Sequence, residues 1–249
     1  KNWQKKYPVI LPEYYQETGY INTYVLIDVL SKHLDEGDLV IPGSSGACSE
    51  VTMQAFKVKP GQRIFNTEGL GPMGFGIPAS LGACIASGRK RTICIDGDGG
   101  FVMNIQDLET VARLNLPVKY FILNNRGYGS IRNTQNNYFN GRLVASDPDS
   151  GLTLPDYRKV ANGFGIRNFR LKTHEELESG ITEILNSDGP VICDIITSFT
   201  HVTAPKLASV QKADGSFESR PLEDLQPFLS REELEENMSI SSKDKKVNR

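Results

Sequence analysis

Two short polar segments carry the residues with the clearest capacity for chemistry. The first is the stretch GDGG at residues 97–100, which contains Asp98, and the second is the pair Asn124-Asn125. An Asp carboxylate and an Asn carbonyl are hard oxygen donors, which suit Mg²⁺ held by few protein groups together with phosphate oxygens. Glycines beside them favour the approach of phosphates to backbone N–H groups. Each segment by itself is typical of an ordinary turn, so its meaning depends on the chain between them.

That chain has the pattern of a βαβ unit. Residues 92–95 form a short apolar, β-branched run that predicts a buried strand ending just before the glycines. Apolar residues at helical spacing over 105–113 predict an amphipathic helix, which Pro117 ends. Residues 118–123 predict a second buried strand leading into Asn124 and Asn125.

Strands of a right-handed βαβ unit are parallel, so their carboxyl ends meet at one edge of the sheet. Asp98 and Asn125 are therefore expected at the same edge, where open α/β sheets bind ligands. The sequence predicts that the two residues share one ligand.

The same residues resemble the signature of thiamine-diphosphate-dependent enzymes, in which Gly-Asp-Gly is followed about two dozen residues later by Asn-Asn. Here residues 100–123, 24 in all, separate Gly99 from Asn124. The longer stretch around both segments resembles the acetolactate synthase branch of this family; it reads GDGGFVMNIQDLETVARLNLPVKYFILNNRGYGSI. The likeness extends from about residue 21 to 196. The resemblance implies thiamine diphosphate and Mg²⁺ as cofactors. It also implies Asp98, Asn125 and the backbone carbonyl of Gly127 as metal ligands, completed by two diphosphate oxygens and a water.

A small-residue turn at 43–46 follows another predicted strand, residues 39–41, and precedes a predicted helix over 47–56. Hydroxyls and backbone N–H groups at a helix N-terminus bind diphosphate readily. A plain strand-to-helix turn explains the same residues equally well. The thiamine family binds diphosphate with the equivalent turn, often through Gly-Thr-Ser or a Gln-His pair, whereas this sequence has Gly43-Ser44-Ser45.

Gly69, Gly71 and Gly74 match the dinucleotide fingerprint G-x-G-x-x-G, with Asp96 as the acidic residue beyond it. Polar residues at 66–68 argue against this interpretation, because the fingerprint follows an apolar strand. The family resemblance implies a different role, in which this segment lies against the aminopyrimidine of the cofactor. Gly71 would then offer its carbonyl to the 4′-amino group, and Met73 would be the apolar wedge that bends the cofactor. Simple packing of Met73 in the core remains the alternative.

Residues 126–130 begin a further helix, where Gly129 and Ser130 are potential diphosphate donors. The polar, turn-rich stretch 135–155 is interpreted as an active-site loop, with disorder as the alternative. Phe139, Asn140 and Arg142 are its candidates for substrate contact. Together, the predicted cofactor-binding residues are Gly43, Ser44, Ser45, Gly71, Met73, Gly97, Asp98, Gly99, Gly100, Asn125, Gly127, Tyr128, Gly129 and Ser130.

Composition excludes several classes of partner. The 28 basic and 30 acidic residues give a net charge of −2, which indicates no nucleic acid and no membrane surface as a partner. No apolar run approaches a membrane span and the first residues lack a signal-peptide core, so a cytoplasmic location is expected. The four cysteines have no C-x-x-C spacing and are expected to be reduced packing residues.

Alternating strands and helices predict an α/β fold, a doubly wound and mainly parallel sheet with helices on both faces. We expect residues 1–14 to be a linker remnant, 15–197 the diphosphate- and metal-binding domain, and 198–249 a C-terminal tail. In the tail, Leu222, Leu225, Phe228 and Leu229 follow helical spacing after Pro221 and predict a short docking helix. Residues 239–249 are expected to be disordered.

The resemblance implies a carboligase similar to acetolactate synthase. Such an enzyme decarboxylates a 2-oxo acid, with pyruvate the expected donor, and ligates the resulting enamine to a second carbonyl. A simple 2-oxo acid decarboxylase is the alternative within the family, and a dinucleotide-binding module is the alternative outside it. The family's activating glutamate belongs to a pyrimidine-binding domain, of the same or a partner chain in a homodimer or tetramer. No stretch of this sequence resembles that domain, so these residues alone are expected to be catalytically incomplete.

Overall fold

The structure is a computed structural model that describes residues 2–44, 46–67 and 69–244. The chain divides into two units, Lys1–Val202 and Thr203–Arg249. In the described part of the chain, no helix combines the length and apolarity that crossing a bilayer requires.

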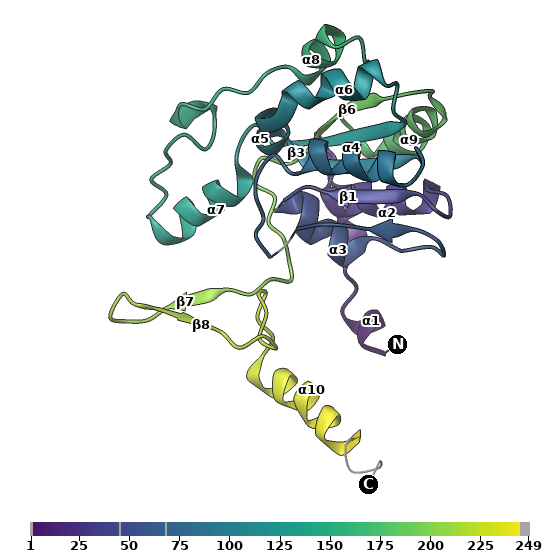
Figure 1. The fold of residues 1–249 in the computed structure, drawn as a ribbon. Helices are drawn as coiled ribbons and strands as arrows, with labels where there is room; N and C mark the ends of the chain where they lie inside the picture. Colours follow the sequence, from purple (N-terminus) through teal and green to yellow (C-terminus); the bar gives the residue numbers. More distant parts are fainter. Residues whose placement is uncertain (1, 45, 68, 245–249) are drawn as a thin grey trace. The chain divides into compact units, whose positions relative to one another are not determined.

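A six-stranded parallel sheet forms the centre of the first unit (Figure 1). Its strand order is β2-β1-β3-β4-β6-β5, and every neighbouring pair is parallel. The predicted doubly wound sheet is therefore confirmed. Its strands are β1 (Leu39–Pro42), β2 (Arg63–Ile64), β3 (Thr92–Gly97), β4 (Val118–Asn124), β5 (Arg167–Leu171) and β6 (Val191–Ile196).

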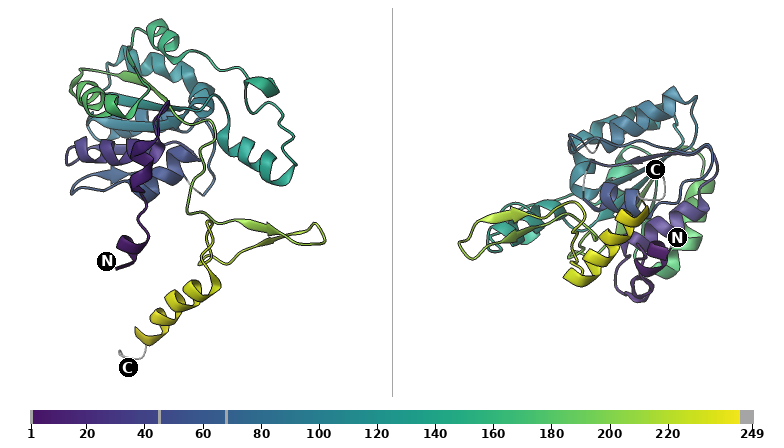
Figure 2. Two further views of the ribbon diagram at one scale, coloured as in Figure 1. Left: turned by 180° about the vertical axis from the view of Figure 1, so that it is seen from behind. Right: turned by 90° about the horizontal axis from the view of Figure 1, so that it is seen from below.

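Helices cover both faces of this sheet, as the views in Figures 1 and 2 show. Local sequence sets several of their ends: the Asn22 side chain accepts a hydrogen bond from the Tyr24 amide at 2.8 Å, and Thr173 and Glu176 form a capping box. The α-helices of the unit are α1 (Asn2–Lys6), α2 (Thr23–His33), α3 (Thr52–Ala55), α4 (Gly76–Ala86), α5 (Asp98–Phe101), α6 (Leu108–Arg113), α7 (Gly129–Tyr138), α8 (Tyr157–Gly163) and α9 (Leu177–Asn186). Shorter turns are 3₁₀-helical at Pro12–Gln16, Val102–Asp107, Pro148–Ser150 and His174–Glu176, and π-helical at Ala47–Val51.

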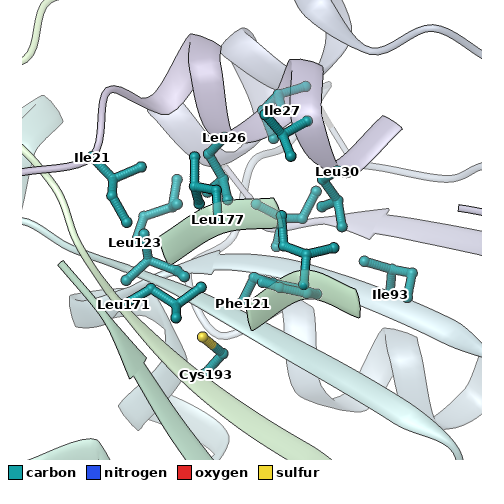
Figure 3. Close-up of a cluster of buried hydrophobic side chains, with 14 of the residues drawn as sticks. Ile21, Leu26, Ile27, Leu30, Ile93, Phe121, Leu123, Leu171, Leu177 and Cys193 are labelled. Carbon is teal, nitrogen blue, oxygen red and sulfur yellow. The ribbon is translucent and has the colours of Figure 1, made fainter. Parts of the chain in front are cut away.

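Alternate residues of the strands enter two separate apolar cores. One core, shown in part in Figure 3, packs α2, α3 and α9 against residues such as Ile93, Phe121 and Cys193. The other core packs α4, α6 and α8 against Cys94 and Ile192, which are adjacent in sequence to Ile93 and Cys193. This period of two is what a sheet buried on both faces requires. The four cysteines, all within the described residues, are buried and form no disulfide, in agreement with the prediction of reduced packing residues.

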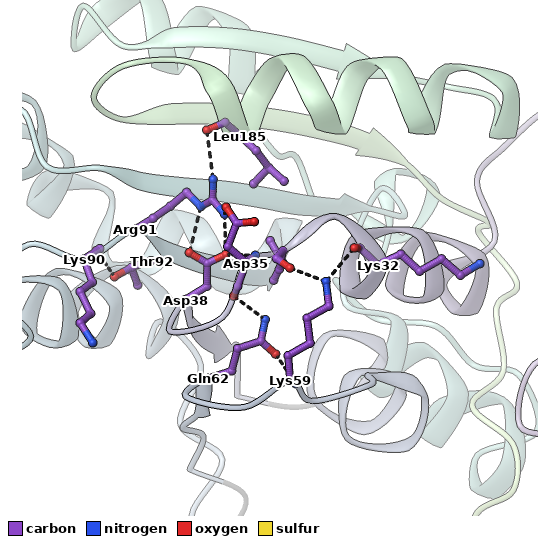
Figure 4. Close-up of polar contacts among 10 residues, drawn as sticks. Lys32, Asp35, Asp38, Lys59, Gln62, Lys90, Arg91, Thr92 and Leu185 are labelled. Atoms are coloured by element: carbon purple, nitrogen blue, oxygen red, sulfur yellow. Dashed lines mark hydrogen bonds and ion pairs between the residues drawn. The ribbon is translucent and has the colours of Figure 1, made fainter.

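Charged side chains join the turns at the edge of the sheet where the strands begin (Figure 4). Arg91, just before β3, donates to the Asp35 carboxylate at 2.8 Å and to the Asp38 carboxylate at 2.6 Å. It also reaches the carbonyl of Leu185 at the end of α9, at 3.5 Å. Lys59 donates to the carbonyl of Lys32 at the end of α2, at 2.8 Å. These contacts join the turns at this edge of the sheet.

A second charged cluster allows a test of stability. Asp28 of α2 is 3% exposed and accepts from the Tyr15 hydroxyl and the Lys57 ammonium, each at 2.6 Å. Burial raises the pKa of Asp28, but hydrogen bonds from Lys32, Lys57 and Tyr15 outweigh it and lower that pKa to about 2. We expect Asp28→Asn to reduce the free energy of unfolding at pH 7 by about 1–3 kcal/mol.

The pH dependence of that difference follows from the lowered pKa. A carboxyl with a depressed folded-state pKa stabilises the fold above its unfolded pKa of 3.8 and loses this contribution as pH falls through about 2. Urea unfolding at pH 7 and pH 3 should therefore show a smaller gap between wild type and Asp28→Asn at the lower pH. The control Glu36→Gln, at an exposed position, should differ from the wild type in unfolding free energy by much less. A difference between wild type and Asp28→Asn that does not change with pH would contradict the lowered pKa of Asp28.

The second unit contains a β-hairpin and a helix. β7 (Ser209–Gln211) pairs antiparallel with β8 (Phe217–Ser219), and α10 spans Arg231–Asp244. The short helix predicted over residues 222–229 is wrong. Pro227 disfavours helical backbone at Gln226, which pairs instead with Lys206 through an isolated bridge, and buried Asp224 binds Arg231 through two contacts of 2.8 Å.

α10 continues to Asp244, into the stretch 239–249 for which the sequence predicts disorder. The Ser230 hydroxyl accepts from the Glu233 amide at 3.2 Å and so caps the helix start. Glu232 and Glu233 in the first turn favour the same helix through its dipole. Residues 245–249 lie outside the described part.

Candidate functional site

The predicted βαβ unit is confirmed, and it brings the two polar segments together. Gly97 of β3 lies beside Leu123 of β4, so Asp98 and the pair Asn124-Asn125 leave the sheet side by side at its carboxyl edge. From β1 the chain passes first to β2, on one side of β1, and then crosses to β3, on the other side of β1. The edge between β1 and β3 is therefore the topological switch point at which open α/β sheets bind ligands.

Asp98 is fixed by the backbone around it. Its carboxylate is 1% exposed and accepts from the Gly99 amide at 2.8 Å and from the Gly127 amide at 3.0 Å. The Tyr157 hydroxyl donates to the Asp98 carbonyl at 2.6 Å. Two backbone amides thus orient the carboxylate, and Tyr157 holds the backbone that carries it.

The charge of Asp98 is poorly compensated by the protein. Burial raises the pKa of this carboxyl to about 7, against the lowering effect of the Gly99 and Gly127 amides. Among the described residues, no lysine or arginine forms an ion pair with it. A buried carboxylate without a protein counterion is suited to binding a cation.

The two neighbouring asparagines have different surroundings. The Asn124 side chain donates to the Asp194 carboxylate at 2.8 Å and is therefore part of the scaffold. The side-chain oxygen of Asn125 is buried and accepts no hydrogen bond from any described residue. Buried acceptors are nearly always satisfied, so this oxygen fits a metal ligand that the protein alone does not supply.

Gly127 completes the predicted ligand set and requires glycine. Its φ is +151°, and a Cβ atom at this position would lie 2.3 Å from the Ser146 carbonyl oxygen. The Tyr128 amide donates to the same oxygen at 2.9 Å. The backbone at Gly127 therefore lies against the loop at Ser146 with no room for a side chain. This contact fixes the backbone of Gly127 beside Asp98.

One carboxylate, one amide oxygen and one backbone carbonyl make a donor set of the type that Mg²⁺ takes when phosphates supply further ligands. The described residues contain no group of three or more His, Cys, Asp or Glu side chains arranged to hold a metal ion. The residues at this edge fit a magnesium diphosphate in chemistry, through Asp98 and the unsatisfied oxygen of Asn125.

Asp96, the acidic residue of the dinucleotide fingerprint, is closely packed among glycines. It is 3% exposed at the end of β3 and accepts from the Gly97 amide at 2.8 Å. Cβ atoms at Gly43 and Gly76 would lie 2.2 and 2.3 Å from its carboxylate oxygens, and one at Gly100 would lie 3.0 Å away. Three glycines therefore enclose Asp96 at the switch point.

This close packing predicts a steric effect. We expect Gly43→Ala to lower the free energy of unfolding by about 1–3 kcal/mol, because the added methyl group overlaps the Asp96 carboxylate. Gly82→Ala is the matched control, since a Cβ atom at this α4 position meets nothing within 4 Å and alanine favours the helix. Urea titration of both variants checks the prediction, which equal stabilities would contradict.

Three segments distant in sequence meet at the switch point. A Cβ atom at Gly46 would lie 2.6 Å from the Ser130 hydroxyl, and one at Gly71 would lie 3.2 Å from the Ser44 carbonyl. The turn after β1 therefore contacts both the start of α7 and the Gly71 segment. Ser44 is 7% exposed, and Ser45 lies outside the described residues.

Two predicted amide donors are already used within the protein. The Gly97 amide donates to Asp96 and the Gly99 amide donates to Asp98. Each carboxylate bonds the amide that follows it, so these amides hold the site together and do not point at a ligand. A Cβ atom at Gly99 would also lie 2.3 Å from the Tyr128 ring, which covers this turn.

Met73 is 42% exposed, so it does not fill the core of this chain. The spacing around it also departs from the dinucleotide fingerprint. β2 ends at Ile64 and α4 begins at Gly76, which leaves a loop where the fingerprint places a strand directly before the first glycine and a helix directly after the turn.

The predicted substrate contacts lie away from the metal ligands. Phe139 follows the last residue of α7, about 15 Å along the helix axis from Gly129 at its start. The loop beyond it returns to the site at Ser146 and Asp147, both of which are buried. Arg132, also buried, touches this return and was not singled out from the sequence, because its partners are remote backbone carbonyls.

Comparison with known proteins gives a consistent result. The family model described as "Thiamine pyrophosphate enzyme, C-terminal TPP binding domain" matches residues 44–195. The acetolactate synthase large subunit of Cyanidium caldarium is 32% identical over 206 residues, which cover 83% of this chain and 34% of that protein. The isozyme 2 large subunit of Escherichia coli (strain K12) is 30% identical over 200 residues, covering 78% and 35%. The chain thus spans about a third of the length of these curated relatives.

Proposed function

The chain belongs to the thiamine pyrophosphate enzymes and contains their C-terminal TPP-binding domain; from this premise we propose that it serves a carboligase similar to acetolactate synthase. Thiamine diphosphate with a divalent metal ion, usually Mg²⁺, is the cofactor of such a domain. The proposed enzyme decarboxylates a 2-oxo acid, with pyruvate as donor, and joins the remaining acyl unit to a second carbonyl. The observation that carries the proposal is the pairing of uncompensated Asp98 with the unsatisfied Asn125 oxygen at one sheet edge.

In this proposal Asp98, Asn125 and the Gly127 carbonyl hold the metal ion. The Ser44 and Ser130 hydroxyls and the Gly129 amide, at the start of α7, donate to the diphosphate. Thiamine diphosphate, when bound, supplies a thiazolium carbon that attacks the 2-oxo acid and an electron sink for the decarboxylation.

The chain's own residues would orient the cofactor. Gly71 would offer its carbonyl to the aminopyrimidine, and Met73, which is exposed in this chain, would support the cofactor with its apolar side chain. The Tyr157 hydroxyl fixes the Asp98 backbone, and the Tyr128 ring covers the turn at Gly99. The metal side of the site is thereby held rigid before any ligand arrives.

Family membership is consistent with a multidomain or oligomeric enzyme. Leu70 is 91% exposed, and Met73 and Met103 are each 42% exposed, an apolar set that favours coverage by another domain. We propose the pyrimidine-binding domain of the same or a partner chain as the cover, in a homodimer or tetramer that acts in the cytoplasm. Two maize relatives are named as chloroplastic.

Product analysis tests the function. The protein assembled with a pyrimidine-binding domain is incubated with pyruvate, Mg²⁺ and thiamine diphosphate. Release of carbon dioxide together with 2-acetolactate supports the carboligase. Acetaldehyde as the sole organic product would make the enzyme a simple decarboxylase, and tight NAD binding without turnover would replace both with a dinucleotide-binding module.

A further inference from the structure

We propose that Arg132 is a positioning residue for the metal site, which acts by fixing the backbone that presents Asn125 and Gly127. This inference rests on the proposed function, since it concerns the ligands of the metal diphosphate. Arg132 does not touch the cofactor in this proposal. It holds the segment from Asn125 to Tyr128 and the loop at Ser146 in one arrangement.

The guanidinium group contacts three separate segments. Arg132 lies on the first turn of α7, is 3% exposed and donates to the Phe199 carbonyl at 2.7 Å. Longer contacts of 3.4 Å join it to the carbonyls of Asn125 and Ser146. Its planar group also lies over the Phe199 ring, 3.9 Å from the centroid. The side chain thus links the end of β4, the returning loop and the segment after β6.

These contacts meet at the backbone of Gly127. The Ser146 carbonyl accepts from both the Tyr128 amide, at 2.9 Å, and Arg132, at 3.4 Å. A Cβ atom at Gly127 would lie 3.0 Å from an Arg132 nitrogen. The guanidinium and the Ser146 carbonyl therefore bracket Gly127, whose amide donates to Asp98 at 3.0 Å. Movement of Arg132 is transmitted directly to two of the three metal ligands.

The partners of Arg132 also explain why it does not neutralise Asp98. All of its hydrogen-bond partners among the described residues are backbone carbonyls, and it forms no ion pair in that part of the chain. Burial lowers the pKa of Arg132, and this effect outweighs the raising effect of the nearby Asp147 and Asp98 carboxylates. A cation that is held by carbonyls forms no ion pair with Asp98 and adds positive potential for the diphosphate.

Arginine is needed here because one planar group serves several acceptors. Lysine at position 132 would keep the charge but lacks the fixed fork of donors and the flat face that packs on Phe199. Methionine would keep much of the volume and lose both charge and donors. Comparing the two variants separates a geometric role from a purely electrostatic one.

The test is a titration of Mn²⁺, a paramagnetic substitute for Mg²⁺, into the protein at saturating thiamine diphosphate, with free Mn²⁺ measured by electron paramagnetic resonance. Outer-shell partners of metal ligands change metal affinity by about 10- to 100-fold when removed. We expect the Kd of Mn²⁺ to rise by that factor in Arg132→Met and by less in Arg132→Lys. Arg167→Lys is the matched control, because Arg167 also stacks on an aromatic ring, Phe169, and is expected to leave the Kd unchanged.

Stability is measured in parallel by urea unfolding. Arg132→Met with lowered stability and an unchanged Kd for Mn²⁺ would reduce Arg132 to a structural residue and overturn the proposal. If that variant does not fold, Phe199→Leu replaces it, since it removes the stacking and keeps the hydrogen-bonding backbone; an unchanged Kd there would also overturn it. Failure of the wild type to bind Mn²⁺ with thiamine diphosphate would instead refute the proposed function.

Discussion

Asp98→Ala is expected to remove Mg²⁺-dependent binding of thiamine diphosphate, with a loss of affinity of at least about 100-fold. The reason is that Asp98 is the only charged side chain in the proposed donor set, while Asn125 and Gly127 contribute neutral oxygens. The fold should survive, because the substitution removes a carboxylate whose burial is costly. Burial raises the pKa of Asp98 to about 7. Fluorescence or calorimetric titration with thiamine diphosphate, with and without Mg²⁺, measures the effect.

Glu109→Ala is the control for that experiment, since Glu109 is an exposed carboxylate of α6 that pairs with Arg113 at 3.6 Å. Its affinity for thiamine diphosphate should equal that of the wild type. Wild-type affinity in Asp98→Ala would show that the metal is held elsewhere. Tight NAD binding by either protein would favour the dinucleotide alternative.

A polypeptide of these 249 residues alone should turn over no pyruvate above a control without enzyme. By family resemblance, the glutamate that activates the aminopyrimidine belongs to the pyrimidine-binding domain. The carboxylates that this structure places at the switch point, Asp96 and Asp98, are both buried, and Asp98 is bonded to two backbone amides and Asp96 to one. Glu68, beside the Gly71 segment, lies outside the described residues.

The measurement is carbon dioxide release from carboxyl-labelled pyruvate by the polypeptide, before and after addition of a pyrimidine-binding domain. Activity that appears only after the addition supports the division of labour between domains. Turnover by the polypeptide alone, in a preparation free of any longer form, would show that it contains its own activating acid.

The sequence predicted the central βαβ unit well because local signals agree there. Apolar runs, a helical period and Pro117 all specify the same elements, and β3, α6 and β4 form within a few residues of the predicted limits. The position of Asp98 beside Asn125 then follows from the parallel pairing of β3 and β4. This part of the site depends on short-range patterns, which a single sequence contains.

The features that were missed depend on long-range contacts. Arg132 is important through carbonyls at Ser146 and Phe199, which are 14 and 67 residues away along the chain. The enclosure of Asp96 by glycines requires β1, β3 and α4 to be packed first. In the tail, helical spacing was misleading because Pro227 and the Asp224–Arg231 ion pair favour an irregular chain.

Calorimetric titration of the protein with thiamine diphosphate, once in Mg²⁺ and once in EDTA, tests whether the edge formed by Asp98, Asn125 and Gly127 binds the diphosphate through a metal ion. We expect saturable binding to one site per chain in Mg²⁺ and its loss in EDTA. Binding of equal strength in both solutions, or saturable binding of NAD in place of thiamine diphosphate, would contradict metal-mediated binding of the diphosphate at this edge.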